Sequence, residues 1–255
     1  MSRTLLVTGG SSGIGRATAL RAAGQGYAVA VQYRAQEAEA ARVVEQMRDV
    51  GVRAVAIQAD LRQASDVERL YDRVDRELGP LNAVVNSAGV AFKRSPVTEL
   101  EAAPLADLFA LNVIGLMLSC REATKRLARA RGGPGGVIVN VSSMAATIGG
   151  RPGSTVYAAS KAAVDVFTVG LAREVASDGI RAISVRPGVV DTEMTRDALA
   201  DPTFVATVAA SIPLGRPAHA DEVAKPIVWL LSDEASFISG ACLDISGGGF
   251  HIARA

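Results

Sequence analysis

Residues 5–15 have the sequence LLVTGGSSGIG, in which a short apolar run passes directly into a glycine-rich turn. Gly9, Gly13 and Gly15 can provide a tight turn, close backbone approach and close packing of a helix that begins near Ile14. The start of such a helix presents unpaired N–H groups and the positive end of its dipole, which suit a pyrophosphate. The stretch therefore predicts a strand, turn and helix that bind a dinucleotide; an ordinary glycine-rich turn is the alternative.

Further Val- and Ile-rich runs alternate with segments of helical period along the whole chain. The expected strands are residues 5–8, 28–33, 54–59, 83–86, 137–141, 182–185 and 242–245, and the expected helices lie near residues 14–25, 37–50, 64–78, 105–131, 156–177 and 220–233. The strands are continuously apolar, which is typical of parallel strands covered on both faces. The alternation indicates an α/β fold, with a doubly wound seven-stranded parallel sheet flanked by helices.

No linker, charge block or internal repeat divides the chain, so we expect a single domain spanning residues 1–255. The one long irregular segment, residues 188–217, contains Pro202, Pro213 and Pro217, which prevent a continuous helix. We expect this segment to be a lid over a site, or a pair of short helices.

The composition argues against several classes of protein. With 49% apolar residues and a net charge of +1, there is no electrostatic case for binding nucleic acid or an acidic membrane surface. Cys120 and Cys242 lie far apart among apolar neighbours, as reduced core thiols do, and His219 and His251 are the only histidines, so no metal site is expected. No apolar run approaches the ~18 residues of a membrane span, and we expect a cytoplasmic protein.

A second feature is the segment Tyr157-Ala-Ala-Ser-Lys161, which begins fourteen residues after Ser143. Residues four positions apart share one face of a helix. A tyrosine hydroxyl ordinarily ionises near pH ~10, and a lysine charge ~5 Å away favours the phenolate by roughly 3 kcal/mol at an effective dielectric of ~20. The pair therefore predicts an acid/base that interconverts a ketone and an alcohol; taken alone, a solvated pair on a helix face is the alternative.

The Gly-x3-Gly-x-Gly spacing, together with Tyr157-x3-Lys161, resembles the short-chain dehydrogenase/reductase family in its branch of roughly 250-residue members. The similarity covers essentially the whole chain: Asn86-Ser-Ala-Gly89 resembles the family's Asn-Asn-Ala-Gly, and residues 186–188 with Thr192 resemble the segment that closes over the nicotinamide. The chain is similar to members described as glucose/ribitol dehydrogenase-like or 3-oxoacyl-acyl-carrier-protein reductase-like. The resemblance implies a Rossmann fold and an NAD(P)-dependent oxidoreductase.

The resemblance also implies the catalytic residues Asn112, Ser143, Tyr157 and Lys161. Tyr157 would act as acid/base, and Ser143, rather than its neighbour Ser142, would hydrogen-bond the substrate oxygen. Lys161 would hold the ribose hydroxyls and lower the tyrosine pKa. Asn112 would anchor a water in a proton relay, with a buried amide bonded to local backbone as the alternative. In family members the tyrosine commonly lies thirteen residues after the serine, whereas here it lies fourteen after it. We expect the extra residue to lie in the loop of residues 147–153 and to alter the shape of the pocket.

The end of the second expected strand bears on the choice of cofactor. NAD enzymes of this fold usually place Asp or Glu there, but here Tyr33 is followed by Arg34, whose guanidinium suits a 2′-phosphate. We therefore expect NADP in preference to NAD, although a solvent-facing charge is the alternative for Arg34. Asp60 would accept a hydrogen bond from the adenine amino group. The expected cofactor contacts are Gly9, Ser11, Ser12, Gly13, Ile14, Gly15, Tyr33, Arg34, Asp60, Leu61, Asn86, Ala88, Gly89, Tyr157, Lys161, Pro187, Gly188, Val190 and Thr192.

Together these residues predict an NADP(H)-dependent oxidoreductase that transfers a hydride between nicotinamide and a carbonyl or secondary alcohol. The alternative is a catalytically silent NADP(H)-binding sensor of the same fold. The substrate stays open among sugars, acyl thioesters and simple ketones. Candidate apolar pocket residues are Phe92, Met144, Ile148, Met194, Phe204 and Leu214, and candidate guides for an acidic substrate are Lys93, Arg94, Arg151 and Arg196. The resemblance implies a homotetramer in which the helices near 105–131 and 156–177 pair across one interface.

Overall fold

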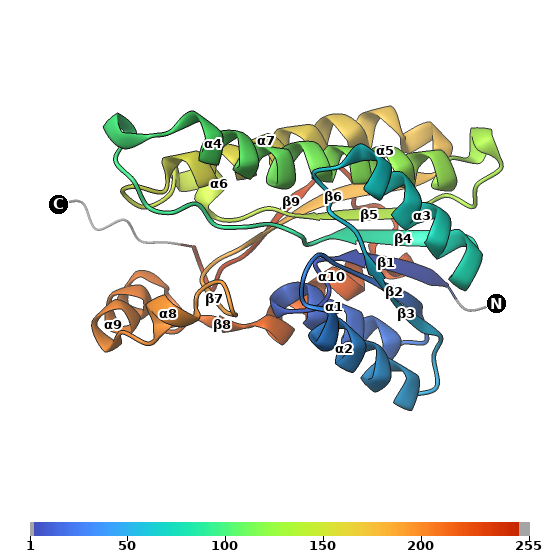
Figure 1. The fold of residues 1–255 in the computed structure, drawn as a ribbon, viewed down its shortest axis with the longest axis horizontal. Helices are drawn as coiled ribbons and strands as arrows, with labels where there is room; N and C mark the ends of the chain where they lie inside the picture. Colours follow the sequence, from blue (N-terminus) through green and yellow to red (C-terminus); the bar gives the residue numbers. More distant parts are fainter. Residues whose placement is uncertain (1–2, 250–255) are drawn as a thin grey trace.

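The computed structural model describes residues 3–249 and has a seven-stranded parallel sheet at its centre (Figure 1). The strands are β1 (Thr4–Thr8), β2 (Ala28–Tyr33), β3 (Ala54–Gln58), β4 (Leu81–Asn86), β5 (Gly136–Val141), β6 (Ile180–Pro187) and β9 (Cys242–Ile245). They are hydrogen-bonded in the order β3-β2-β1-β4-β5-β6-β9. The expected doubly wound α/β fold is confirmed, with strand ends that differ from the expected ones by one or two residues.

Helices cover both faces of this sheet (Figure 1). One face carries α1 (Gly13–Ala23), α2 (Glu37–Asp49) and α10 (Ala220–Leu230), and the other carries α3 (Ala64–Leu78), α5 (Leu116–Leu127) and α7 (Thr155–Glu174). Successive strand side chains enter two separate buried clusters, so that Leu5 and Val7 pack on the α1 side and Leu6 packs on the α3 side. Because both faces are buried, the strands need apolar residues at every position, which is the pattern that the sequence shows.

The strand order reverses at β1, which lies between β2 and β4. In doubly wound sheets, ligands bind outside the carboxyl ends of the strands at this reversal. Two segments meet there: the glycine-rich turn that follows Thr8, and the residues that follow Asn86 at the end of β4. The topology therefore positions these two segments for a shared site.

The expected helix over residues 105–131 is divided. It begins earlier as α4 (Ala102–Phe109), widens into a π-helical segment η2 (Ala110–Gly115), continues as α5 and ends at Leu127, before a short 3₁₀ turn η3 (Arg129–Arg131). By length and composition alone the run Ala102–Leu127 could cross a membrane. Its most apolar 18-residue stretch has a mean hydropathy of 1.7, and 39% of that stretch is buried inside the protein. This is weak evidence, because a core helix that packs on a sheet passes the same test.

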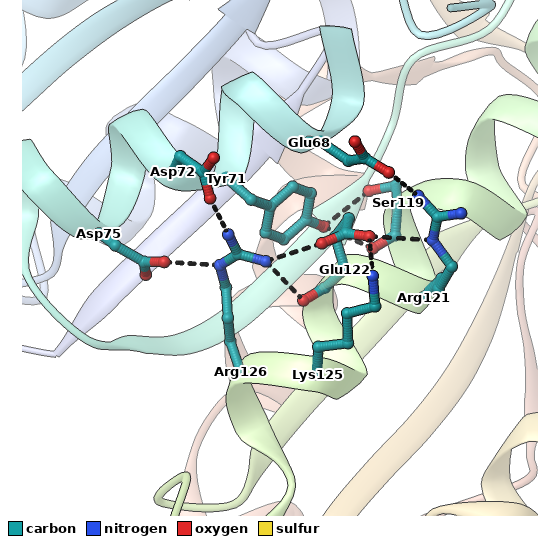
Figure 2. Close-up of polar contacts among 9 residues, drawn as sticks. All are labelled: Glu68, Tyr71, Asp72, Asp75, Ser119, Arg121, Glu122, Lys125 and Arg126. Carbon is teal, nitrogen blue, oxygen red and sulfur yellow. Dashed lines mark hydrogen bonds and ion pairs between the residues drawn. The ribbon is translucent and has the colours of Figure 1, made fainter. Parts of the chain in front are cut away.

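Ion pairs connect α5 to α3, the two neighbouring helices on one face of the sheet (Figure 2). The Arg126 guanidinium reaches Asp72 and Asp75 of α3, both at 2.6 Å. On α5 itself, the buried Glu122 carboxylate accepts hydrogen bonds from Arg126 at 2.9 Å and from Lys125 at 2.8 Å. The network fixes the spacing of the two helices above the sheet.

Residues 188–217 form two short helices rather than one long one. They contain β7 (Val190–Asp191), α8 (Arg196–Leu199) and α9 (Pro202–Ser211), and β7 pairs in parallel with β8 (Ala218–His219). Pro202 lies in the first turn of α9, where its missing N–H is not needed, and Pro213 follows the end of that helix. Figure 1 shows α8 and α9 beyond the carboxyl end of the sheet, at the same end as α6 (Ala145–Ile148). Short 3₁₀ helices complete the secondary structure: η1 (Val97–Glu99), η4 (Ala176–Asp178) and η5 (Asp233–Ala235).

Candidate active site

A cavity of about 1080 Å³ opens where the carboxyl ends of β1, β4 and β5 meet. Three of the four expected catalytic residues line it, namely Ser143, Tyr157 and Lys161. The expected cofactor residues that line it are Gly9, Ser11, Ser12, Gly13, Ile14, Tyr33, Arg34, Asp60, Leu61, Ala88, Gly89, Tyr157, Lys161, Pro187, Gly188, Val190 and Thr192. Asn112, Gly15 and Asn86 do not line the cavity.

The turn after β1 is packed so closely that side chains would not fit. Gly9 has φ +62°, and a Cβ there would lie 2.8 Å from the Cα of Ala88. At Gly15 a Cβ would lie 2.3 Å from the carbonyl oxygen of Gly9, so this residue packs α1 onto the turn and does not face the cavity. Ser12, the N-cap of α1, makes no side-chain capping bond. Its hydroxyl and the first N–H groups of α1 are therefore available to a phosphate.

The end of β2 presents a cation and no carboxylate. Tyr33 and Arg34 both line the cavity, and the Gln58 amide donates to the Arg34 carbonyl oxygen at 2.9 Å. This bond fixes the Arg34 backbone while its side chain stays exposed. Within residues 3–249, Arg34 has no carboxylate within 4.0 Å. The geometry is thus compatible with a phosphate contact at this position.

Two glutamines that line the same wall were missed by the sequence reasoning. Gln32 accepts a hydrogen bond from the Gly9 N–H at 2.9 Å and donates to the Ala59 carbonyl oxygen at 2.7 Å. Gln36 accepts from the Ser11 hydroxyl at 3.0 Å. The signal for Gln32 was present, because it is the one amide in the otherwise apolar strand sequence AVAVQY. A buried amide needs partners, and here its partners are the turn and β3.

Asp60 follows β3 and has a partner within the chain. One of its carboxylate oxygens accepts from the Arg62 backbone N–H at 3.1 Å, and the other accepts from the Arg62 guanidinium at 3.2 Å. The side chain is 31% exposed and lines the cavity beside Leu61. An ionised carboxylate has about four acceptor positions, so Asp60 retains capacity for a donor such as an adenine amino group.

The Asn86 side chain lies in the core beneath the site and does not line the cavity. Its amide donates to Asn140 at 2.8 Å and accepts from the Ser119 hydroxyl at 2.6 Å. The chain of hydrogen bonds continues from Ser119 to the Tyr71 hydroxyl at 2.8 Å and from Asn140 to Thr168 at 2.9 Å. This network of hydrogen bonds joins α3, α5, β4, β5 and α7, and it occupies the Asn86 side chain within the core.

Ser143 and Tyr157 meet at the cavity wall. Ser143 follows the end of β5 and Tyr157 lies on α7, both line the cavity, and the Ser143 hydroxyl lies near enough to Tyr157 to act on its pKa. The hydroxyl of Ser142 points elsewhere and donates to the Lys161 carbonyl oxygen at 2.9 Å. The two adjacent serines thus face opposite directions, and Ser143 is the one that meets the tyrosine.

Lys161 lies one turn beyond Tyr157, with its Nζ atom 5.8 Å from the centroid of the tyrosine ring. Nζ donates to the Val141 carbonyl oxygen at 2.9 Å, and the residue is 5% exposed. Burial lowers the pKa of Lys161 to about 8, while the negative charge of Asp165 acts to raise it.

The expected lowering of the Tyr157 pKa is not found. Burial raises the pKa of Tyr157, and the neighbouring Ser143 hydroxyl acts in the opposite direction on that pKa. The physical reason lies in Lys161, whose ammonium is directed to Val141 and whose charged form is itself disfavoured by burial.

Asn112 lies in the π-helical segment η2 and is completely buried. Its side chain accepts from the Val90 N–H at 2.9 Å, donates to the Val90 carbonyl oxygen at 3.0 Å, and donates to the Ser160 hydroxyl at 3.3 Å. Ser160 in turn donates to the Tyr157 carbonyl oxygen at 2.7 Å. The amide thus binds the backbone of Val90, which is distant in sequence, and it links the loop after β4 to α7.

Of the candidate substrate residues, five line the cavity: Phe92, Met194, Phe204, Arg94 and Arg151. The others do not: Met144, Ile148, Leu214, Lys93 and Arg196. Met144 shows why composition could not separate the two sets, since it is an apolar residue like the others but is buried and does not line the cavity.

No group of three or more His, Cys, Asp or Glu side chains within residues 3–249 is arranged to hold a metal ion. His219 lies at the exposed start of α10, and His251 lies outside the described residues. Cys120 and Cys242 are both free thiols, and burial raises the pKa of Cys120 to about 12. The Cys120 thiol is therefore protonated and unreactive at neutral pH.

Comparisons with known proteins agree with this geometry. A family model described as Enoyl-(Acyl carrier protein) reductase matches residues 9–251. The chain is 46% identical over 244 residues to the uncharacterized oxidoreductase YgfF of Escherichia coli, covering 95% of this chain and 98% of that protein. It is 36% identical over 248 residues to the 3-oxoacyl-[acyl-carrier-protein] reductase FabG of Staphylococcus aureus, covering 97% and 98%.

A solved structure extends the likeness to three dimensions. The short chain dehydrogenase from Burkholderia cenocepacia, crystallised in complex with NADP, superposes with a TM-score of 0.89 at 34% identity. The match covers 96% of this chain and 97% of that one. Fold, motif spacing and relatives agree over nearly the whole length, and the chain belongs to the short-chain dehydrogenase/reductase family of oxidoreductases.

Proposed function

We propose that this protein is an NADP(H)-dependent enzyme that reduces a carbonyl compound or oxidises a secondary alcohol, with Tyr157 as the acid/base. The observation that carries the proposal is that Ser143, Tyr157 and Lys161 line the same cavity as the glycine-rich turn. A small-molecule carbonyl or alcohol would be the substrate.

The residues present fit a dinucleotide. The turn at Gly9 and Gly13 excludes side chains, and the uncapped N-terminus of α1 at Ser12 offers N–H donors to a pyrophosphate. Leu61, Ala88 and the other cavity residues of the expected cofactor set would hold the remaining parts. When bound, the nicotinamide supplies or accepts the hydride.

The side chains of this protein would transfer the proton to or from the substrate oxygen. In the reduction direction, the Ser143 and Tyr157 hydroxyls would both donate to the carbonyl oxygen and stabilise its developing charge, after which Tyr157 transfers its proton. Lys161 would hold the ribose hydroxyls with its ammonium group. Asn112 would support a proton relay through the loop after β4, where it fixes Val90.

A preference for NADP over NAD rests on the end of β2. Arg34 lines the cavity with no carboxylate within 4.0 Å in residues 3–249, and a guanidinium matches the charge and the fork geometry of a 2′-phosphate. An acidic residue, which would repel that phosphate, is absent from this strand end.

Replacement of Tyr157 by Phe tests the acid/base role. We expect turnover of a carbonyl panel with NADPH to fall by roughly 10²–10⁴-fold, while NADPH binding, measured by fluorescence, is retained. Tyr27→Phe is the matched control, because the Tyr27 hydroxyl bonds the Leu231 carbonyl oxygen in the core. A near-normal rate in Tyr157→Phe would refute the role. If the unmodified protein bound NADPH and turned over none of the panel, the silent sensor would be the better description.

Replacement of Arg34 by Ala tests the cofactor preference. We expect the variant to bind NADPH about tenfold or more weakly and NADH with little change, since only NADPH carries the 2′-phosphate. Arg42→Ala, an exposed arginine of α2 that pairs with Glu39, is the control. Equal losses for both nucleotides would count against the phosphate contact.

We further propose one domain over residues 1–255, with residues 188–217 as a lid. Thr192 of this segment supports the lid, because its Cγ2 lies 3.3 Å from where a Cβ on Gly13 would be.

A cytoplasmic homotetramer, with no nucleic-acid or membrane partner, is also proposed. Its support is the exposed apolar side chains Ile114 and Val166, 52% and 75% exposed on the helices expected to pair. Light scattering of Val166→Glu would show a smaller particle if α7 forms that interface.

A further inference from the structure

Two guanidinium groups share one aromatic ring in the wall of the cavity. The Cζ atom of Arg151 lies 5.3 Å from the centroid of Phe204, and that of Arg94 lies 6.0 Å from it. The three residues come from separate parts of the chain: the loop after β4, the loop between α6 and α7, and helix α9. All three line the same cavity as Ser143 and Tyr157.

Backbone contacts hold the two arginine-bearing loops together. The Ser95 N–H donates to the Gly153 carbonyl oxygen at 3.1 Å, and the Ser154 N–H closes a turn by donating to the Arg151 carbonyl oxygen at 2.8 Å. Gly153 has φ +80°, and a Cβ there would lie 3.3 Å from the Cβ of Arg94. The loop that contains Arg151 is also the one with the extra residue between Ser143 and Tyr157. Its additional length therefore belongs to a segment that brings the second arginine to the cavity.

The paired cations lack a counter-charge. Within residues 3–249, neither Arg94 nor Arg151 has a carboxylate within 4.0 Å. Burial lowers the pKa of Arg151, and the positive charge of Arg94 lowers it further. Two like charges held near one ring raise the free energy of the empty site, and an anion between them would lower it.

Acidic residues that line the cavity are engaged elsewhere or pair with neither arginine. Asp60 pairs with Arg62, Glu193 lies 3.7 Å from Arg196, and Asp201 accepts from the Thr203 N–H at the start of α9. Asp197 lines the cavity from α8 and forms no ion pair with either guanidinium at that distance.

We propose that Arg94 and Arg151 bind an oxyanion, a carboxylate or a phosphate, carried by the substrate. This inference rests on the proposed function, because it places the carbonyl or hydroxyl group of that substrate at Tyr157. The substrate class is then an oxo or hydroxy compound with an acid group at its far end. A guanidinium suits both anions through paired N–H donors, and the apolar Phe92 and Met194 line the same cavity for the carbon chain between the two ends.

The test compares charged substrates with neutral analogues of the same shape. Linear oxo acids of increasing chain length are assayed with NADPH beside their methyl esters, and dihydroxyacetone phosphate is assayed beside dihydroxyacetone. We expect a higher kcat/KM for the charged member of at least one pair, and the pair that shows it distinguishes carboxylate from phosphate. In the double variant R94M/R151M, kcat/KM for that charged member should fall roughly tenfold or more, chiefly through KM.

The controls separate charge recognition from general damage. The neutral analogue and the NADPH affinity should be unchanged in the double variant, and Arg196→Met, a lid arginine that does not line the cavity, should behave like the unmodified protein. The loss of kcat/KM should be smaller when Arg151 is replaced by Lys than when it is replaced by Met, because lysine keeps the charge but not the planar fork of N–H donors. Equal losses for charged and neutral members would overturn the proposal, as would the absence of any preference for a charged member in the unmodified protein.

A binding measurement keeps this proposal distinct from the proposed function. Calorimetric titration of the protein loaded with NADP⁺, which cannot reduce an oxo group, with the same oxo acids and phosphate ester measures binding without turnover. Loss of binding in R94M/R151M would support the anion site even if no carbonyl were reduced. Binding that is equally tight in the variant would refute the site even if reduction proceeds.

Discussion

Lys161 Nζ donates a hydrogen bond to the carbonyl oxygen of Val141 at 2.9 Å, which ties the ammonium group to the end of β5 beneath the cavity. This bond holds the lysine where burial disfavours its charge, and its pKa is lowered from 10.5 to about 8. At neutral pH the group still carries its proton, but near pH 8 it begins to lose it. The lysine therefore couples the ionisation of the site to the stability of the fold.

The first prediction concerns that coupling. Between about pH 8 and pH 10.5 the unfolded chain binds more protons at Lys161 than the folded one, so the free energy of unfolding rises with pH in this window. The rise due to this residue should be of the order of 3 kcal/mol. Urea unfolding of Lys161→Met should lack it, whereas Lys93→Met, at an exposed loop position, should keep it. Parallel pH profiles for the unmodified protein and Lys161→Met would contradict the coupling.

A second prediction separates backbone conformation from close packing at the turn. Gly9 and Gly51 both have a left-handed φ, of +62° and +85°, but only at Gly9 would a Cβ approach another backbone atom, the Ala88 Cα, at 2.8 Å. Gly51→Ala should destabilise the protein by roughly 1–2 kcal/mol from conformation alone. Gly9→Ala should cost several kcal/mol more in urea unfolding and should weaken NADPH binding. Similar losses for both variants would mean that the contact with Ala88 is not tight.

The sequence predicted the strands and the cavity because both depend on local patterns. Seven apolar runs define the sheet, and the spacing of Gly9, Gly13 and Gly15 defines the turn at its switch point. The alternation of side chains along a strand showed that only one of Ser142 and Ser143 can face Tyr157, and the resemblance to the family selected Ser143.

What the sequence could not provide depends on contacts between distant elements. Asn86 closes β4 beside a glycine-rich loop, so nothing local shows that its side chain turns toward Asn140 of a neighbouring strand. The pKa of Tyr157 likewise depends on burial and on where Lys161 points, neither of which spacing reveals. The contact of Arg94 and Arg151 with Phe204 also needs two loops and one helix to meet in space.

The third prediction uses Asn86 to distinguish a core residue from a cofactor contact. Asn86→Ala would leave the buried partners Asn140 and Ser119 with unmade hydrogen bonds, at a cost of about 1–3 kcal/mol in urea unfolding. The folded variant should bind NADPH as the unmodified protein does, because the side chain faces the core. In a double-mutant cycle with Asn140→Ala the two losses should be non-additive by about 0.5–3 kcal/mol. Weak NADPH binding at full stability would restore the cofactor role.

The last prediction concerns acid stability and the carboxylate at the centre of Figure 2. Burial acts to raise the pKa of Glu122, but hydrogen bonds from Lys125 and Arg126 outweigh it, and the pKa lies below its ordinary value of 4.5. The contribution of Glu122 to stability is therefore complete above pH 4.5 and is lost as the pH falls through the folded pKa.

Replacement of Glu122 by Gln should remove that contribution, lower the free energy of unfolding at neutral pH, and flatten its fall below pH 4.5. Glu77→Gln is the matched control, because Glu77 forms an exposed pair with Arg73 one turn away on α3, and such pairs contribute about 0.3–0.5 kcal/mol. Urea unfolding at neutral pH and at pH values below 4.5 compares the three proteins. If Glu122→Gln lost no more stability than Glu77→Gln, the ion pairs between α3 and α5 that do not involve Glu122, namely Arg126 with Asp72 and Asp75 and Arg121 with Glu68, would be sufficient to hold the two helices.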